Sequence, residues 1–325
     1  MPLTPDPSPS LTSPGFRTVA SPLTAAMLAP LDPRCRVVQF RSALTAPDCE
    51  RLAAFLEASP EVELRVYGGI DGELRDVEFL RFFPRLRRLS VDVPGLEDLT
   101  GLRHVPDDLT TLYLGATKVR RFSLAVLHRF ARLRVLSLEG YRTDIEALGR
   151  LAALEALTLR SITLPDLRPL LPLPRLRALA LRLGGTTDLG LLPELGCLRA
   201  VELMLIRGLA DVGPVGAIPT LERLSLQALR RVDHLPDLRA AAALRCVHLD
   251  TLRGLRDLTP LCACPALEEV HLLNMGHLEV DDVRCLQQLP TLRRLAVGLG
   301  STRKNAAVRA LLPVPAPHPY RREFG

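Results

Sequence analysis

Apolar residues recur along this chain in one fixed pattern, L-x-x-L-x-L, with leucine or valine at its fourth and sixth positions. Copies of the pattern begin at Leu86, Leu109, Leu133, Leu154, Leu176, Leu198, Leu221, Leu244, Leu267 and Leu292. Successive copies start 21 to 25 residues apart, and Leu64 with Val66 forms a degenerate earlier copy. Self-similarity at a fixed period is typical of an array of one small structural unit, and it predicts a repeat protein.

The period and the motif resemble those of bacterial leucine-rich-repeat proteins, in particular the short, internalin-like class with repeats of about 22 residues. The resemblance covers residues 60–300. One departure concerns the ninth position of the repeat, where that family usually has asparagine. Here the position holds Tyr141, Ile162, Gly184, Ile206, Leu229, Leu252 and Met275. We therefore expect apolar packing in place of an asparagine ladder, and turns less regular than those of the family.

The resemblance implies an α/β fold, a leucine-rich-repeat solenoid that forms a right-handed arc with a parallel β-sheet on its concave face. Each motif predicts a short strand whose fourth and sixth residues point into the core, while the third, fifth and seventh lie on the opposite face. The return segments are short and contain proline, as in Leu164–Leu167 and Leu258–Leu261. They predict 3₁₀ or single helical turns on the convex face.

Five segments are expected from the pattern. Residues 1–34, rich in proline and serine, predict a disordered leader, and either Met1 or Met27 could be the true start. Residues 35–60 predict an N-terminal cap made of a strand and a helix, with Thr45 as the helix N-cap. The repeats occupy residues 61–300 and number about ten or eleven. Residues 301–312 predict a C-terminal capping helix, and residues 313–325 a flexible tail.

Composition and charge argue against nucleic-acid binding and membrane insertion. Net charge is +6, but much of the excess lies in residues 301–325, and no basic stripe that would favour nucleic acid is apparent. No apolar run is long enough to cross a membrane. The seven cysteines show no framework spacing, which favours reduced thiols in the cytoplasm. We expect a monomer that binds neither nucleic acid nor membrane.

The expected strand register identifies the residues of the concave face. Small residues form its floor, and larger polar, aromatic and sulfur-containing side chains surround them. Arg, Met and Tyr are enriched in interface cores, so we expect a protein partner to bind there. The candidate contacts are Tyr67, Arg88, Tyr113, Arg160, Arg182, Glu202, Met204, His248, Asp250, Glu269 and His271.

His248 and His271 occupy the same row of adjacent predicted strands, about 4.8 Å apart, and with Asp250 they are weak candidates for a Zn²⁺ site. Ser225, His248 and Asp250 also have the residue types of a nucleophile, base and orienting carboxylate. A flat strand offers them no oxyanion donors and no enclosed pocket. No nucleotide-binding or hydrolase motif is present, and no cofactor is expected.

The sequence therefore predicts a non-enzymatic protein-interaction module. Two alternatives stay open at this point. One is a secreted effector that acts on a host protein, with a delivery signal in the Pro/Ser-rich leader. The other is a metal-dependent hydrolase at the histidine pair.

Overall fold

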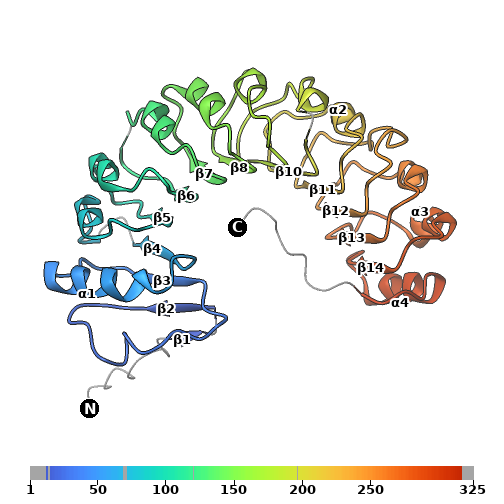
Figure 1. The fold of residues 1–325 in the computed structure, drawn as a ribbon. Helices are drawn as coiled ribbons and strands as arrows, with labels where there is room; N and C mark the ends of the chain where they lie inside the picture. The colour runs from blue at the N-terminus through green and yellow to red at the C-terminus, as the bar shows by residue number, and fades with distance from the viewer. Residues whose placement is uncertain (1–11, 14, 69–71, 120, 196, 317–325) are drawn as a thin grey trace, which may run out of the picture. The chain divides into compact units, whose positions relative to one another are not determined.

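The fold consists of two units, Met1–Thr143 and Asp144–Gly325, each built around a β-sheet. The computed structural model describes residues 12–13, 15–68, 72–119, 121–195 and 197–316. Within each unit, the strands lie on one side and the short helical segments on the other (Figure 1). We call the side of each sheet that faces away from those helical segments its sheet face.

The sheet of the first unit follows chain order. Its strands are β1 (Thr12–Ser13), β2 (Phe16–Thr18), β3 (Val37–Phe40), β4 (Glu63–Tyr67), β5 (Arg88–Asp92), β6 (Thr111–Leu114) and β7 (Val135–Glu139). β1 is antiparallel to β2, and each later pair is parallel. Between them lie α1 (Ala46–Glu57), η1 (Glu78–Phe82), η2 (Thr100–His104) and η3 (Leu124–Arg129).

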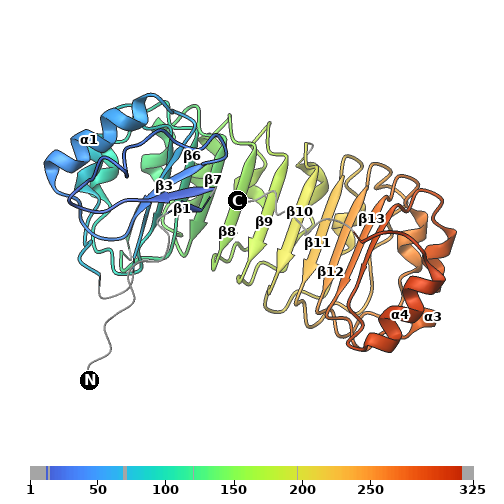
Figure 2. The same ribbon diagram turned by 90° about the horizontal axis from the view of Figure 1, so that it is seen from below.

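The second unit repeats this arrangement with parallel strands in chain order (Figure 2). The strands are β8 (Ala156–Arg160), β9 (Ala178–Arg182), β10 (Ala200–Met204), β11 (Arg223–Gln227), β12 (Cys246–Asp250), β13 (Glu269–Leu273) and β14 (Arg294–Val297). The helical segments are η4 (Ile145–Arg150), η5 (Arg168–Leu170), η6 (Leu192–Glu194), α2 (Gly213–Gly216), η7 (Thr259–Ala263), α3 (Val280–Val283), η8 (Arg284–Gln288) and α4 (Thr302–Leu311). The predicted strands and short 3₁₀ turns are confirmed.

The motif leucines form the core of both units. In β8, Leu157 and Leu159 at the fourth and sixth positions are fully buried, as is Leu154 at the first. Because side chains alternate along a strand, Ala156, Thr158 and Arg160 lie on the other side, the sheet face. The predicted orientation of the motif is therefore confirmed.

The turns that follow the strands of the second unit are regular, contrary to the expectation from the missing asparagine. In the first six repeats of this unit the eighth residue has a left-handed backbone, with φ between 52° and 57° at Ser161, Leu183, Leu205, Ala228, Thr251 and Asn274. Its amide donates to the next repeat, as from Leu205 to the Gln227 carbonyl at 2.9 Å. The ninth residue is buried in five of these six repeats, as Ile206 and Leu229 are. Backbone hydrogen bonds and apolar packing together order these turns without an asparagine at the ninth position.

The N-terminal segment differs from the predicted leader. Residues 1–11 and 14 lie outside the described residues, but residues 15–34 are structured. β2 pairs with β3, and Val19 and Leu23 are buried. The Leu23 amide and the Ser21 hydroxyl donate to the Asp48 carboxylate of α1. Proline and serine suggested disorder, but a buried carboxylate on a neighbouring helix anchors this segment.

Asp48 also belongs to the predicted helix start, because its amide donates to the N-cap Thr45 side chain. The surrounding hydrogen bonds, that from the Ser21 hydroxyl first, hold the pKa of the Asp48 carboxyl below its ordinary value. A lowered pKa stabilises the folded state above the ordinary carboxyl pKa of about 3.9. That stabilisation is lost as pH falls through the lowered value.

We expect the Asp48→Asn substitution to release residues 16–23 while α1 stays formed, because the amide keeps only one acceptor oxygen. Hydrogen exchange followed by mass spectrometry should show faster exchange in residues 16–23 at neutral pH. In the wild type, acidification through the lowered pKa of Asp48 should produce the same change. Asp32→Asn is the matched control, since Asp32 is exposed and its carboxylate accepts hydrogen bonds from Arg34 of the same segment. Unchanged exchange in Asp48→Asn would contradict this anchoring role.

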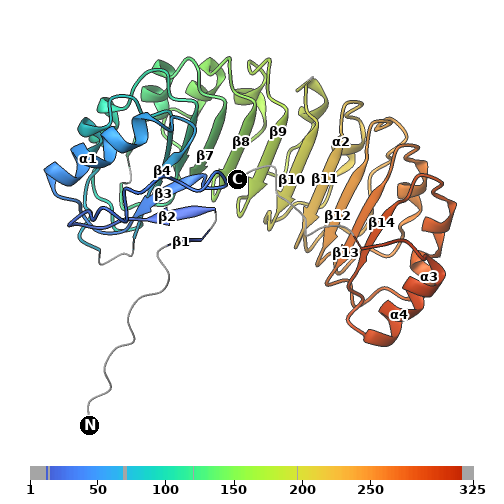
Figure 3. The same ribbon diagram turned by 60° about the horizontal axis from the view of Figure 1, so that its bottom comes forward.

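The C-terminal end of the second unit is covered by α4, which lies beside α3 (Figure 3). Its N-cap is Ser301, whose side chain accepts from the Lys304 amide, and Val308 is fully buried. The Pro315 carbonyl accepts from the Leu295 amide of β14. Of the predicted flexible tail, residues 313–316 are described, and residues 317–325 lie outside the described part. Among the described residues, no helix is long and apolar enough to cross a membrane.

Candidate functional site

The sheet face of the second unit has a floor of small side chains. Ala178, Ala180 and Ala200 are buried and pack together, with Ala156 against them. Their strands are in register, with Ala178 opposite Ala200 and Ala156 opposite Ala178. In-register parallel strands therefore produce the floor that the repeat pattern predicted.

Arg182 and Glu202 meet on this floor and form a two-point ion pair. Arg182 Nε lies 2.8 Å from Glu202 Oε1, and Arg182 Nη2 lies 3.0 Å from Glu202 Oε2. Glu202 is fully buried, and the Arg182 side chain is only 10% exposed. The sequence predicted both as partner contacts. The structure brings them together, and their charges are already compensated within the chain.

The more accessible residues of this face surround the ion pair. Arg160 and Met204 are half-buried, and Arg223 and Arg294 are exposed. Arg160 lies opposite Arg182, and Met204 lies opposite Gln227. These side chains, rather than Arg182 or Glu202, offer the surface that a partner could touch. Arg223 and Arg294 occupy the third position of their repeats, which the register places on this face, but they were not among the candidate contacts.

The sheet face of the first unit carries Tyr67, Arg88 and Tyr113, all half-buried. Arg65 is two residues before Tyr67 on the same strand, and its guanidinium lies 5.2 Å from the centre of the Tyr67 ring and 2.8 Å from an Asp92 oxygen. Arg88 lies 3.7 Å from Glu61. Burial raises the pKa of the Tyr113 hydroxyl.

The predicted histidine pair forms on the sheet face of the second unit. His248 and His271 are register partners, and their rings stack with centroids 5.5 Å apart. Both are buried. His271 Nε2 lies 2.6 Å from Glu269 Oε1, whereas His248 Nε2 lies 3.9 Å from the nearer Asp250 oxygen.

The possible metal donors differ from the predicted set. Asp250 accepts hydrogen bonds from the Thr251 hydroxyl and the Asn274 amide group. The donor atoms of Cys246, Glu269 and His271 instead lie within 4.8 Å of one another. Cys246 was not among the predicted metal ligands. Its place opposite Glu269 in the register is the signal that could have identified it.

Ser225 lies opposite His248 on the adjacent strand, two residues before Gln227 on its own strand. The Ser225 hydroxyl accepts a hydrogen bond from Gln227 Nε2 at 2.8 Å, and Ser225 is fully buried. A nucleophile needs a base within hydrogen-bond reach. Because Ser225 is fully buried, its hydroxyl is not accessible to a substrate in this structure.

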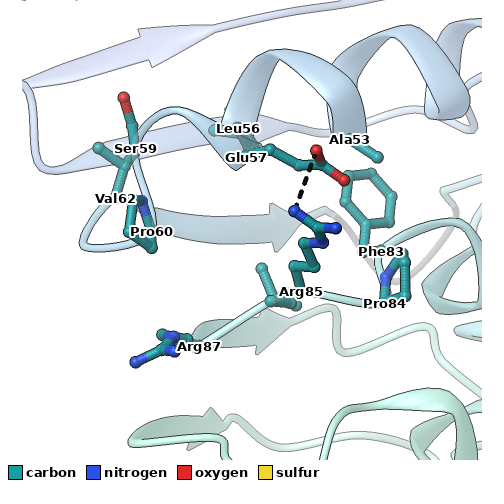
Figure 4. A pocket seen from close by; sticks show the side chains of 11 residues that line it. Ala53, Leu56, Glu57, Ser59, Pro60, Val62, Phe83, Pro84, Arg85 and Arg87 are labelled. Carbon is teal, nitrogen blue, oxygen red and sulfur yellow. Dashed lines mark ion pairs between the residues drawn. The ribbon is translucent and has the colours of Figure 1, made fainter.

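A small pocket opens in the first unit, away from the sheet-face residues. It lies between the end of α1, the loop before β4 and the loop after η1, as Figure 4 shows. An ion pair between Arg85 and Glu57, 3.5 Å long, crosses it. None of the predicted contact residues lines it.

Comparison with known proteins bears on the fold. No protein-family model matches the chain, and no curated protein matches it significantly. Among solved structures, an internalin (inlF) from Listeria monocytogenes is similar, with 16% identity, 81% of each chain covered and a TM-score of 0.55.

Two further similar structures have lower TM-scores. The LRR protein LIC12759 from Leptospira interrogans has 14% identity and a TM-score of 0.48, with 87% of this chain and 89% of that chain covered. The plant peptide hormone receptor RGFR1, in complex with RGF2, has 16% identity and a TM-score of 0.46. That match covers 80% of this chain and 41% of the receptor chain. The repeat motif, the parallel sheets with 3₁₀ returns and the internalin match together show that this chain has the leucine-rich-repeat solenoid fold.

Proposed function

We propose that this chain is a non-enzymatic protein-interaction module, and that the sheet face of its second unit binds a protein partner. The observation that carries the proposal is the floor of buried alanines beside a compensated Arg182–Glu202 pair, with accessible Arg160, Met204 and Arg223 around it. Solenoids commonly bind their partners on such surfaces. We expect the protein to act as a monomer in the cytoplasm.

The physical argument rests on preorganisation. The backbone of the floor is fixed by in-register parallel strands, so little conformational entropy is lost when a partner binds. Small side chains let the partner approach the sheet closely. Arg160, Met204 and Arg223 then supply the long side chains that bury area at an interface, and Arg and Met are enriched in interface cores.

The test is a paired affinity capture from lysate of the source cells, followed by cross-linking mass spectrometry. The test variant is Arg160→Glu combined with Arg223→Glu. We expect a captured protein that cross-links to the sheet face of the wild type, and we expect the variant to lose it. Arg182 is left unchanged, because a second carboxylate beside buried Glu202 would disturb the fold.

The matched control is Arg150→Glu combined with Arg175→Glu, which makes the same change of charge at exposed positions outside the sheet. The control should retain the partner. If the sheet-face variant, folded by circular dichroism, retains every partner of the wild type, the proposed surface is wrong. Arg88→Glu applies the same test to the sheet face of the first unit, where Tyr67 and Tyr113 are the neighbouring proposed contacts.

A further inference from the structure

Three metal-binding residue types converge on the sheet face of the second unit, on β12 and β13. Cys246 Sγ lies 3.9 Å from Glu269 Oε1, and that oxygen lies 2.6 Å from His271 Nε2. All three donor atoms lie within 4.8 Å of one another. We propose that Cys246, Glu269 and His271 bind a Zn²⁺ ion.

The strand register explains why these donors meet. Cys246 and Glu269 are opposite each other on adjacent parallel strands, which places their side chains about 4.8 Å apart on one face. Glu269 and His271 are two residues apart on the same strand, so they share that face. The convergence therefore rests on rigid, hydrogen-bonded backbone and not on a loop.

The distances are close to those of a tetrahedral zinc site. Bond lengths of about 2.0–2.3 Å from zinc to S, N and O place pairs of ligand atoms roughly 3.4–3.6 Å apart. The Cys246–Glu269 separation of 3.9 Å is slightly longer, and the Glu269–His271 separation of 2.6 Å is shorter because it is a hydrogen bond. Binding requires this hydrogen bond to open by less than about 1 Å, and it brings together the Cys246 and His271 donor atoms, which lie within 4.8 Å of each other.

The charges also suit a divalent cation. On binding, the Cys246 thiol releases its proton to solvent, and the thiolate with the Glu269 carboxylate neutralises the two positive charges. His271 binds through the Nε2 lone pair of its neutral ring. Arg294 lies 3.6 Å from the other carboxylate oxygen, Oε2, so Glu269 can keep this neighbour while Oε1 binds the metal.

The surroundings leave a path to solvent and a fourth coordination position. Cys246 and His271 are buried, but the Glu269 side chain is 24% exposed. Three protein ligands and one open position, filled by water, form a common zinc arrangement. His248 stacks on His271 and, in this proposal, packs beside the site without binding the metal.

The experiment uses the full chain, treated with chelator and then titrated with Zn²⁺ and, separately, Co²⁺. We expect one equivalent of Zn²⁺ by calorimetry. Co²⁺ should give the intense visible bands of a tetrahedral site and a near-ultraviolet thiolate charge-transfer band. Cys246→Ser should abolish the thiolate band. Cys246→Ser and His271→Asn should each weaken Zn²⁺ binding at least about ten-fold, since even outer-shell changes weaken metal sites by this much.

Two controls separate this site from others. His248→Asn should keep the metal and the thiolate band. Cys262→Ser with Cys285→Ser should also keep both, although these cysteines contact each other through the Cys262 thiol and the Cys285 carbonyl. The proposal is overturned if the wild type binds no stoichiometric Zn²⁺. It is also overturned if binding survives Cys246→Ser unchanged, or if it is lost in the Cys262/Cys285 variant while that variant remains folded.

Discussion

Replacing Glu202 by alanine is expected to lower the free energy of unfolding by about 3–5 kcal/mol. The reason is burial. Glu202 is fully inaccessible, and its carboxylate makes two hydrogen bonds to the guanidinium of Arg182, which is itself only 10% exposed. Removing the carboxylate leaves a positive charge in a desolvated place without the negative charge that compensates it. Urea unfolding followed by far-ultraviolet circular dichroism measures the effect, because the chain has no tryptophan.

Replacing both residues distinguishes the net contribution of the ion pair to stability from the cost of leaving one charge buried alone. Replacing both residues, Arg182→Met with Glu202→Leu, should restore most of the lost stability, since well-packed apolar pairs often replace buried ion pairs at little cost. We expect the double variant to lie within about 1–2 kcal/mol of the wild type. If Glu202→Ala alone lowers the free energy of unfolding by less than about 1 kcal/mol, the ion pair is exposed to water in solution and less buried than in the structure.

Gly216→Ala is expected to destabilise the second unit by about 1–3 kcal/mol or more, the usual cost of forcing extra atoms into a packed region. Gly216 belongs to α2, where alanine would ordinarily be about 1 kcal/mol better than glycine. Here an added Cβ would lie 2.1 Å from the Asp237 carbonyl oxygen in the following repeat. Backbone cannot give way as a flexible side chain can, so the repeats must separate locally.

Gly190→Ala is the matched control for this prediction. Its Cβ would meet only one atom within 4 Å, Asp188 Oδ1 at 3.2 Å, at the end of an exposed side chain. We expect this variant to be neutral or slightly stabilised, because alanine restricts the unfolded chain. Equal stability of Gly216→Ala and the wild type would show that α2 is not held as close to the next repeat as the structure has it.

The L-x-x-L-x-L spacing was enough to predict the strands, their inward leucines and the 3₁₀ returns. Apolar residues alternate within each motif, and the motifs recur every 21–25 residues. A single repeat cannot bury its apolar face alone, so the repeats must stack on their neighbours. The same register predicts that His248 lies beside His271, and the structure pairs them. The prediction of Thr45 as a helix N-cap also needed only the local sequence, because an N-cap depends on residues three positions apart.

Features that depend on pairs of side chains from different repeats were decided only by the tertiary structure. Arg182 and Glu202 both lie on the sheet face, but only their side-chain conformations turn two expected contacts into one buried ion pair. Residues 15–34 were expected to be disordered from composition, and a carboxylate more than twenty residues away, Asp48, anchors them.

The metal donors show most clearly which features the sequence determines and which only the tertiary structure decides. The sequence determined which residues share a face, because the strand period fixes that. It favoured Asp250 as the carboxylate near the histidines, since Asp250 follows His248 by two residues. The tertiary structure instead brings Glu269 to His271 and Cys246 to Glu269. Alternation along a strand is a property of the backbone, whereas the distance between two charged atoms is set by rotamers, burial and competing partners such as Thr251 and Asn274.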